Sequence, residues 1–282
     1  MLTVLNGLSF GFILFLLASG LSLIMGAMGV LNLAHGALYM VGAYVGWSVA
    51  VDQDASFLLA VVAGAAAAGL VGLVMERGLF ARLHDRLDEQ ILAAFGCLYI
   101  LTDLVSLIWG PQAKAPIDVP ALDGSVTIAG FSYPLVRVVI IGVGIAFAIG
   151  LWWLQERTRA GAIVRAGMDD SSMVRAIGIN VELVVALLFV VGAAVAGAAG
   201  VIGGLVLGAS TSFGIDVLLL ALIVVVLGGV GSVGGALAGA LMVGVVDTVS
   251  RTELPEVSSF TLYALMTVVL LLRPTGLSGK AA

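Results

Sequence analysis

Charged residues are scarce in this chain of 282 residues. Asp, Glu, Lys and Arg together make up 10% of the sequence, whereas hydrophobic residues make up 61%. A soluble domain carries about 25% charged residues, so most of this outer surface must face something other than water. The apolar runs are long and continuous, which excludes a transmembrane β-barrel with its ten-residue alternation. The composition therefore predicts an all-α polytopic membrane protein.

Residues that support catalysis or metal binding are also rare. Cys97 is the single cysteine, so no intrachain disulfide forms, and with only His35 and His84 beside it no metal cluster can be built. There is no phosphate-binding G-x-x-x-x-G-K-[ST] loop, which residues 276–280 resemble only superficially. A basic nucleic-acid footprint is absent as well. We therefore expect no enzyme activity, no cofactor, no metal and no nucleic acid, and transport energy would come from a partner or an ion gradient.

Runs of about 20 apolar residues predict the membrane-spanning helices. The first run has no Lys or Arg before it and exceeds signal-peptide length, so we expect a retained helix and not a cleaved leader. The count of spans is about nine. Their predicted bounds are 2–26, 30–51, 56–76, 90–109, 134–155, 183–206, 214–230, 233–250 and 257–272.

Lys and Arg in the short loops predict the orientation of the spans. Nine of the 12 basic residues fall on one side of a nine-span chain, in segments 77–89 and 156–182 and in the C-terminal tail. Lys114, Arg137 and Arg251 fall on the other side. The split predicts a cytoplasmic C-terminus and an N-terminus outside.

Small residues every four positions predict close helix packing, which lipid does not otherwise drive. Ala60, Gly64, Ala68 and Gly72 share one face of the third span. Two further series occur later in the chain, Gly200, Gly204 and Gly208, and Gly231, Gly235 and Gly239. We interpret most of them as packing seams of a tight bundle.

Polar residues at membrane depth are the candidates for a transport pathway. Asp103 lies within the fourth span, either as a structural hydrogen-bonding group or as a pathway residue. The uncharged stretch Gly26–Gly36 contains Asn32 and His35 at the expected cytoplasmic end of the first two spans. Asn32 can cap the following helix, and both side chains can instead line or brace a gate.

Gly228, Gly231 and Ser232 belong to a glycine-rich joint between two short spans, Gly228-Gly229-Val230-Gly231-Ser232. Three glycines in five residues suit a tight turn or an unwound, broken helix. Both interpretations remain open on the sequence alone.

The cytoplasmic segment 156–182 contains a predicted short helix. Asp169 or Asp170 can cap it, Ile177 belongs to its apolar edge with Met173 and Ile179, and Gly178 can end it. An apolar edge outside the membrane fits a helix lying on the bilayer surface or one that docks into a groove of a cytoplasmic partner.

Several of these stretches, taken together, resemble the LivH-type permeases of branched-chain amino-acid ABC importers. The resemblance extends from Gly7 through Asn32-Leu-Ala-His-Gly36 and Met40-Val-Gly-Ala-Tyr44 to the tail Arg273-Pro-Thr-Gly-Leu277. Arg165–Asn180 resembles the family's coupling element, and Leu227–Ala236 is similar to its glycine-rich joint. These landmarks occur in order over nearly the whole chain.

The resemblance implies a single permease domain, 1–282, with a type II-like importer fold of two inverted repeats, about 2–109 and 183–272. It implies a bacterial inner-membrane location, among lipid, and three kinds of partner: a second permease subunit, two cytoplasmic ATPase subunits and an extracytoplasmic substrate-binding protein. The expected ATPase contact comprises Asp169, Asp170, Ala176, Ile177, Gly178 and Ile179. Gly167-Met168-Asp169-Asp170 replaces the Glu-Ala-Ala coupling motif of other importers, which leaves the docking register open.

The expected function is half of the translocation path for branched-chain or related amino acids. Similar permeases serve urea or short-chain amides, and the sequence does not separate these substrates. An autonomous secondary transporter is a weaker alternative, because it requires paired ionisable groups at mid-membrane and the sequence offers Asp103 alone. A non-transporting scaffold would have no need of the polar interruptions near Asn32 and Ser232.

Overall fold

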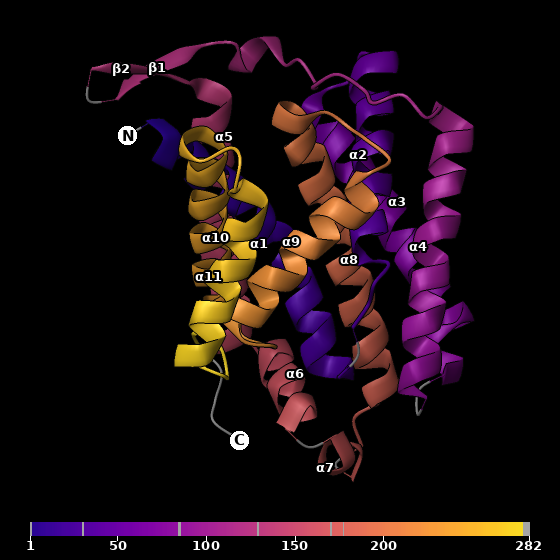
Figure 1. Cartoon of the computed structure of the whole chain (residues 1–282). Coiled ribbons are helices and arrows are strands. Elements are labelled where there is room, and N and C mark those ends of the chain that lie inside the picture. The colour runs from indigo at the N-terminus through magenta and orange to yellow at the C-terminus, as the bar shows by residue number, and fades with distance from the viewer. Residues whose placement is uncertain are drawn as a thin grey trace.

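The computed structural model describes residues 2–29, 31–83, 86–128, 130–169, 171–176 and 178–278. Within these ranges the chain is almost entirely helical, with one small antiparallel hairpin (Figure 1). The helices are α1 (Leu2–Met28), α2 (His35–Trp47), α3 (Phe57–Gly78), α4 (Leu87–Trp109), α5 (Leu135–Arg157), α6 (Arg159–Asp169), α7 (Ser171–Ala176), α8 (Val181–Leu207), α9 (Phe213–Gly228), α10 (Val233–Glu253) and α11 (Ser258–Leu272). The hairpin strands are β1 (Ser125–Ile128) and β2 (Phe131–Pro134), paired from Ser125 with Pro134 to Ile128 with Phe131.

The chain is a helical, multi-pass membrane protein by the length and composition of its helices. Six helices are long and apolar enough to cross a bilayer within the described ranges, namely α1, α3, α4, α5, α8 and α10. The apolar helices α9 and α11 are shorter, and α2 is extended by one π-helical turn, Ser48–Asp52. Each of the nine predicted spans thus coincides with a helix. Nine crossings would require that α2, α9 and α11 also cross the membrane.

Burial divides the helices into an inner and an outer set. The apolar windows of α1 and α8 are mostly buried, whereas those of α4 and α5 are mostly exposed. α1 packs most extensively against α10, and α8 packs against both α2 and α3. Figure 1 shows α4 standing at one edge of the bundle and α5, α10 and α11 grouped at the other. Exposed leucine, isoleucine and valine side chains lie on α4, α5 and α11, as expected for a surface in contact with lipid.

Glycines lie where helix backbones touch, which confirms the predicted packing seam of the third span. Ala60, Gly64, Ala68 and Gly72 are all buried on α3. A Cβ atom on Gly197 of α8 would lie 2.5 Å from the Gly64 carbonyl oxygen, so this contact is made by backbone atoms. Direct backbone contact gives the close van der Waals packing that holds helices together in lipid.

The two ends of the bundle differ in structure. The hairpin and the N-terminus lie at one end, and α6, α7 and the last described C-terminal residues lie at the other (Figure 1). The long segment between α4 and α5 is tied to the bundle by paired backbone hydrogen bonds between Lys114 and Ala209, at 2.7 and 3.2 Å. We call the end with the hairpin the hairpin end and the other the loop end.

Two local differences from the sequence-based expectation have physical causes. The helix predicted from residue 30 begins at His35, because Gly29 ends α1 with a positive φ of 67° and the following residues do not resume the helix. Segment 156–182 was expected to hold one short helix, but α6 is a second one. α6 has no long apolar run, because only one of its faces meets the protein. Such an amphipathic helix is not predicted from a run of apolar residues.

Candidate functional site

Asn32 and His35 lie deep in the protein and not at the end of a helix pair. The exposed fractions of their side chains are 3% and 0%. His35 Nε2 lies 3.1 Å from the carbonyl oxygen of Leu17, which is 11 residues before the end of α1, or roughly 16 Å of helix rise. The expectation that both residues mark the cytoplasmic end of the first two spans is therefore wrong. Chain between α1 and α2 folds back along α1, and non-helical backbone at this depth is tolerated because protein buries it.

The polar groups of this buried segment are only partly satisfied. Asn32 Oδ1 accepts a hydrogen bond from the Ala34 backbone N–H at 3.0 Å, but Ala34 is the N-cap of α2 and no side chain that the structure describes caps this helix, so the predicted capping role of Asn32 is wrong. Asn32 Nδ2 and His35 Nδ1 have no hydrogen-bond partner among the residues that the structure describes. Buried polar atoms without partners are uncommon in native proteins and call for an explanation.

The start of α2 meets the start of α9 inside the bundle. A Cβ atom on Gly36 would overlap the Gly214 carbonyl oxygen, so the two backbones touch. The segment before α9 resembles the one before α2, because Ser210 Oγ accepts from the N–H of Ser212, two residues on, at 3.3 Å. Two short helices thus begin in the protein interior, each after a non-helical segment.

The joint between α9 and α10 is a tight turn, which resolves the alternative between a turn and a broken helix. Gly228 ends α9, and Gly229 and Gly231 have positive φ angles of 96° and 77°. Ser232 caps α10 by accepting from the Gly235 N–H at 3.1 Å. Gly231 N–H donates to Ser22 Oγ of α1 at 3.1 Å, which anchors the turn to the core.

The C-terminal tail completes this joint. Leu277 N–H donates to the Leu227 carbonyl at 2.8 Å, and Ser278 N–H donates to the Gly228 carbonyl at 3.1 Å. These bonds satisfy carbonyl groups that the last turn of α9 leaves without a helical partner. Two of the sequence stretches that carry the family resemblance, the glycine-rich joint and the Arg273–Leu277 tail, therefore form one structural unit.

Asp103 is not part of this interior. It lies on the exposed side of α4, near Leu104 and Leu107, and makes no hydrogen bond or ion pair within the described ranges. The neighbouring Thr102 hydroxyl donates to the Leu98 carbonyl of its own helix at 2.8 Å. The structure does not bring Asp103 together with Asn32, His35 or the joint.

The proposed coupling residues lie at the loop end. Ala176 is the last residue of α7, and Asp169 is the last residue of α6. Asp170 and Ile177 lie outside the described residues. Gly178 ends the short helix as predicted, with φ of 86° and with hydrogen bonds from Gly178 N–H to Arg175 O at 3.0 Å and from Ile179 N–H to Val174 O at 3.3 Å.

The two apolar sides of this short helix have different surroundings. Val174 is buried and packs with Val181 and Val185 of α8, and Ile179 packs against the same group. Met173 points away from them, with an exposed fraction of 62%. The predicted apolar edge is therefore divided, since Ile179 faces α8 and Met173 faces outward.

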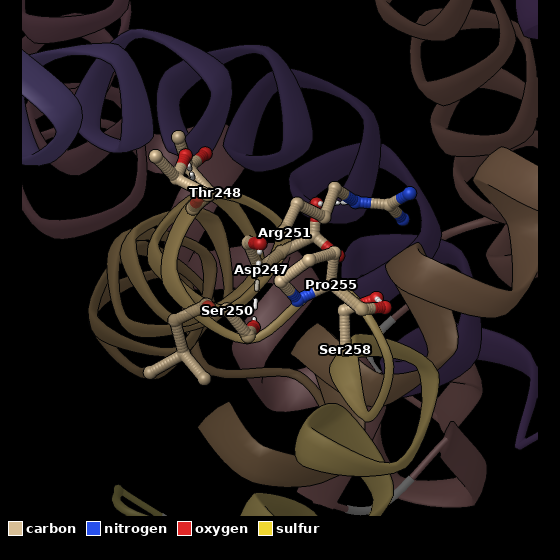
Figure 2. A network of polar contacts seen from close by, with 8 residues as sticks. Asp247, Thr248, Ser250, Arg251, Pro255 and Ser258 are labelled. Atoms are coloured by element: carbon tan, nitrogen blue, oxygen red, sulfur yellow. Dashed lines mark hydrogen bonds and ion pairs between the residues drawn. The ribbon is translucent and has the colours of Figure 1, made fainter.

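An ion pair at the hairpin end was not recognised in the sequence, where its residues were assigned to a span end and a loop. Asp247 Oδ2 and Arg251 Nε are 2.8 Å apart on the last two turns of α10 (Figure 2). Only 6% of the Asp247 side chain is exposed, against 65% for Arg251. The spacing of four residues was the available signal, because it places both side chains on one helix face.

The comparison with known families is decisive once these features are in view. Residues 3–270 match the family described as "Branched-chain amino acid transport system / permease component". The chain belongs to this permease family. The match covers α1 through α11, so it includes the buried α2 start, the joint and the loop-end helices.

Individual relatives of the permease agree with the family match. The high-affinity branched-chain amino acid transport system permease protein LivH of Salmonella typhimurium is 32% identical, over 98% of this chain and 94% of the relative. LivH of Escherichia coli K12 and BraD of Pseudomonas aeruginosa, described in the same words, are each 31% identical over the same shares. Among solved structures, "PsaBC from Streptococcus pneumoniae in complex with Fab" superposes with a TM-score of 0.51 over 95% of this chain and 89% of that one. Its 14% identity supports the fold alone.

Proposed function

We propose that this chain is the membrane-spanning permease subunit of an ATP-driven importer and forms half of the translocation path for branched-chain or related amino acids. The observation that carries the proposal is the identity of 31–32% to branched-chain amino acid permeases over 98% of the chain. The absence of a phosphate-binding loop in the sequence supports an external ATPase. A permease for urea or short-chain amides is the second candidate, and an autonomous secondary transporter is a weaker third.

The proposed assembly contains a second permease subunit, two cytoplasmic ATPase subunits and an extracytoplasmic binding protein, in a bacterial inner membrane. The distribution of basic residues supports a cytoplasmic loop end and a hairpin end outside. With α2, α9 and α11 counted as crossings, the chain spans the membrane nine times. The ATPases would then meet α6 and α7, and the binding protein would meet the hairpin end.

Paired packing supports the proposal of two inverted repeats, 2–109 and 183–272. Their order of helices is the same: α1 and α8 have 27 residues each, α3 and α10 have 22 and 21, and each repeat contains a short second helix. α1 packs on α10, and α8 packs on α3, as a two-fold relation between repeats requires. The contact of Gly36 with Gly214 lies between the two short helices, where such an axis would pass.

A gate role for Asn32 and His35 follows from their unpaired nitrogens. If α2 moves relative to α1 during the transport cycle, Asn32 Nδ2 and His35 Nδ1 gain water or substrate as partners. We expect a cysteine at position 32 or 35, in a Cys97→Ser background, to react slowly with a cytoplasmic-side maleimide at rest. The labelling rate should rise when ATP and a transition-state inhibitor hold the importer in another state.

Ala81→Cys is the matched control for this labelling experiment, because Ala81 is exposed near the loop end in the resting structure. It should react at a similar rate in every state. Burial of both test positions in all states would remove the gate role and leave Asn32 with a structural role in the segment before α2.

Uptake by reconstituted protein tests the function itself. We expect liposomes that contain this chain with its permease and ATPase partners to accumulate leucine, isoleucine or valine only with internal ATP and external binding protein. The chain alone should not transport. Gradient-driven uptake by the chain alone would favour the secondary transporter, and ATP-driven uptake of urea without leucine uptake would favour the second candidate.

A further inference from the structure

A cavity of about 440 Å³ opens among α1, α5, α8, α9 and α10 at the hairpin end. Its volume lies within the roughly 300–1,000 Å³ of small-molecule sites. The walls are apolar on the side formed by Phe10, Phe213 and Val217. The ion pair of Asp247 and Arg251 borders the other side, together with Arg137 at the start of α5. The cavity is thus mainly apolar, with a few charged groups on its wall.

Arg137 contributes a second cation to the cavity, beside Arg251. It is half-buried, and it forms no ion pair or hydrogen bond with the residues described in the structure. Tyr133 lies near it, and burial raises the pKa of the Tyr133 hydroxyl above its ordinary value, although the Arg137 charge acts in the opposite direction. Tyr133 therefore remains a neutral phenol at neutral pH and supplies no negative charge. A partly desolvated guanidinium is stabilised by a carboxylate, which it binds in a bidentate manner.

Asp247 and Ser9 also contribute polar atoms to the cavity wall. Asp247 is buried and has Arg251 as its one ion-pair partner within the described ranges, bonded through a single oxygen, Oδ2. Ser9 of α1 is 1% exposed, and its hydroxyl has no partner among the described residues. Arg137, Arg251 and Asp247 sum to one positive charge, so the cavity offers a site for a carboxylate and, beside it, an anion for an ammonium group.

We propose that this cavity is the entry site of the permease for the zwitterion of an apolar α-amino acid. The substrate carboxylate binds Arg137, its ammonium group binds Asp247, and its side chain packs against Phe10, Phe213 and Val217. This inference rests on the proposed function and names its substrate class. Urea and short-chain amides carry neither charge, so they would form no ion pair with the guanidinium of Arg137 or the carboxylate of Asp247.

The position of the cavity suits this role. It lies at the end opposite α6 and α7, where the binding protein would release substrate, and Val206 and Leu207 at the end of α8 form part of its wall. Arg251 lines the cavity and is mostly exposed, and Figure 2 shows its side chain beside Asp247. An incoming zwitterion therefore meets one accessible cation before it reaches the deeper groups.

Protection of a cysteine in the wall tests the proposal. The full chain, with its partner subunits, is placed in nanodiscs without binding protein, and carries Thr248→Cys in a Cys97→Ser background. Leucine should slow maleimide labelling roughly tenfold when its concentration is about ten times the Kd of the cavity. Arg137→Gln should raise the leucine concentration that gives half-maximal protection roughly 10- to 100-fold, as expected when a charged hydrogen bond is lost. Arg82→Gln, at the loop end, is the matched control and should not change it.

Three compounds, compared with leucine, separate the possible ligands: 4-methylpentanoate, 3-methylbutylamine and urea. We expect 4-methylpentanoate, which lacks the amino group, and 3-methylbutylamine, which lacks the carboxylate, to need at least about tenfold higher concentrations than leucine for half-maximal protection. Urea should not protect. Equal protection by leucine, 4-methylpentanoate and 3-methylbutylamine would overturn the zwitterion site and indicate a merely apolar one. The proposal also fails if leucine gives no protection, or if nanodiscs with anionic lipid block labelling by themselves, which would identify a lipid headgroup.

Uptake measured on the same protein separates this inference from the proposed function. ATP-driven leucine uptake without leucine protection at Thr248→Cys would overturn the entry site and leave the importer function intact. Protection without any ATP-driven uptake would overturn the importer function and leave the binding site.

Discussion

Replacing Gly235 with alanine is expected to abolish assembly of the permease. A Cβ atom at this position would overlap the Gly228 carbonyl oxygen, and one on Gly228 would likewise overlap backbone atoms of Gly235. α9 and α10 cannot separate to make room, because a four-residue turn joins them and Ser22 and the C-terminal tail both hold that turn. The expected cost is at least about 3 kcal/mol, the upper end of the usual overpacking penalty.

Gly234→Ala is a matched control one residue away. Gly234 is exposed in the same helix, and no atom lies within 4 Å of where its Cβ would be. Its replacement should be neutral or stabilise α10 by about 0.5–1 kcal/mol through helix propensity. Thermal unfolding in detergent and the yield of assembled importer measure both variants. Equal stability of the two would show that the contact between α9 and α10 is looser than the structure indicates.

Introducing a charge at Met173 is expected to uncouple ATP hydrolysis from uptake. In our proposal, the exposed Met173 side chain enters a groove of a cytoplasmic ATPase, while Val174 holds α7 against α8. Met173→Asp would leave a desolvated carboxylate in that contact, with an expected fall in uptake of roughly 10- to 100-fold. The fold of the chain should not change, because the residue is exposed. The ratio of leucine taken up to ATP hydrolysed is the quantity to measure.

Ala81→Asp is the control for this substitution, since it adds the same charge to an exposed position near the loop end. It should leave uptake unchanged. Normal coupling in Met173→Asp would remove the docking assignment from α7, and a loss of both uptake and assembly in both variants would indicate a general effect of negative charge at this end.

α8 gives a physical route between α7 and the proposed entry cavity. Its first residues, Val181 and Val185, pack with Val174 of α7, and its last ones border the cavity about 40 Å away. Between them, a Cβ atom on Gly200 would overlap the Tyr39 carbonyl oxygen of α2. Movement of α7 would therefore displace a rigid helix that touches both α2, which begins at His35, and the entry site.

The predicted spans matched the helices closely because each is a run of apolar residues of sufficient length. Span 233–250 became Val233–Glu253, and span 134–155 became Leu135–Arg157. The prediction was wrong where hydropathy does not report backbone geometry. Residues 30–34 are uncharged, so hydropathy did not indicate that the second helix begins at His35. The depth of His35 became visible only from its contact with Leu17.

The candidate site was predictable only in part. Gly178 was correctly assigned to the end of a short helix, because a glycine after such a segment is a local signal. The alternative of turn or broken helix at Gly228–Ser232 needed the contact with Ser22, which is 209 residues from Gly231 in the chain. Asp103 was selected because it is a charge within a span, but its position on the outer face of α4 depends on which helices lie beside it.

The sequence alone determined that this protein is a helical membrane protein, how its loops are charged and that it belongs to a permease class. These properties depend on composition and on the order of residues along the chain, because the length of apolar runs and the charge of the loops decide how a chain inserts into a bilayer. Only the tertiary structure brought Arg137, Asp247 and Ser9 to one cavity, from three helices widely separated in sequence. Backbone contacts at glycines decide that arrangement, because they determine how closely and at which depth the helices meet.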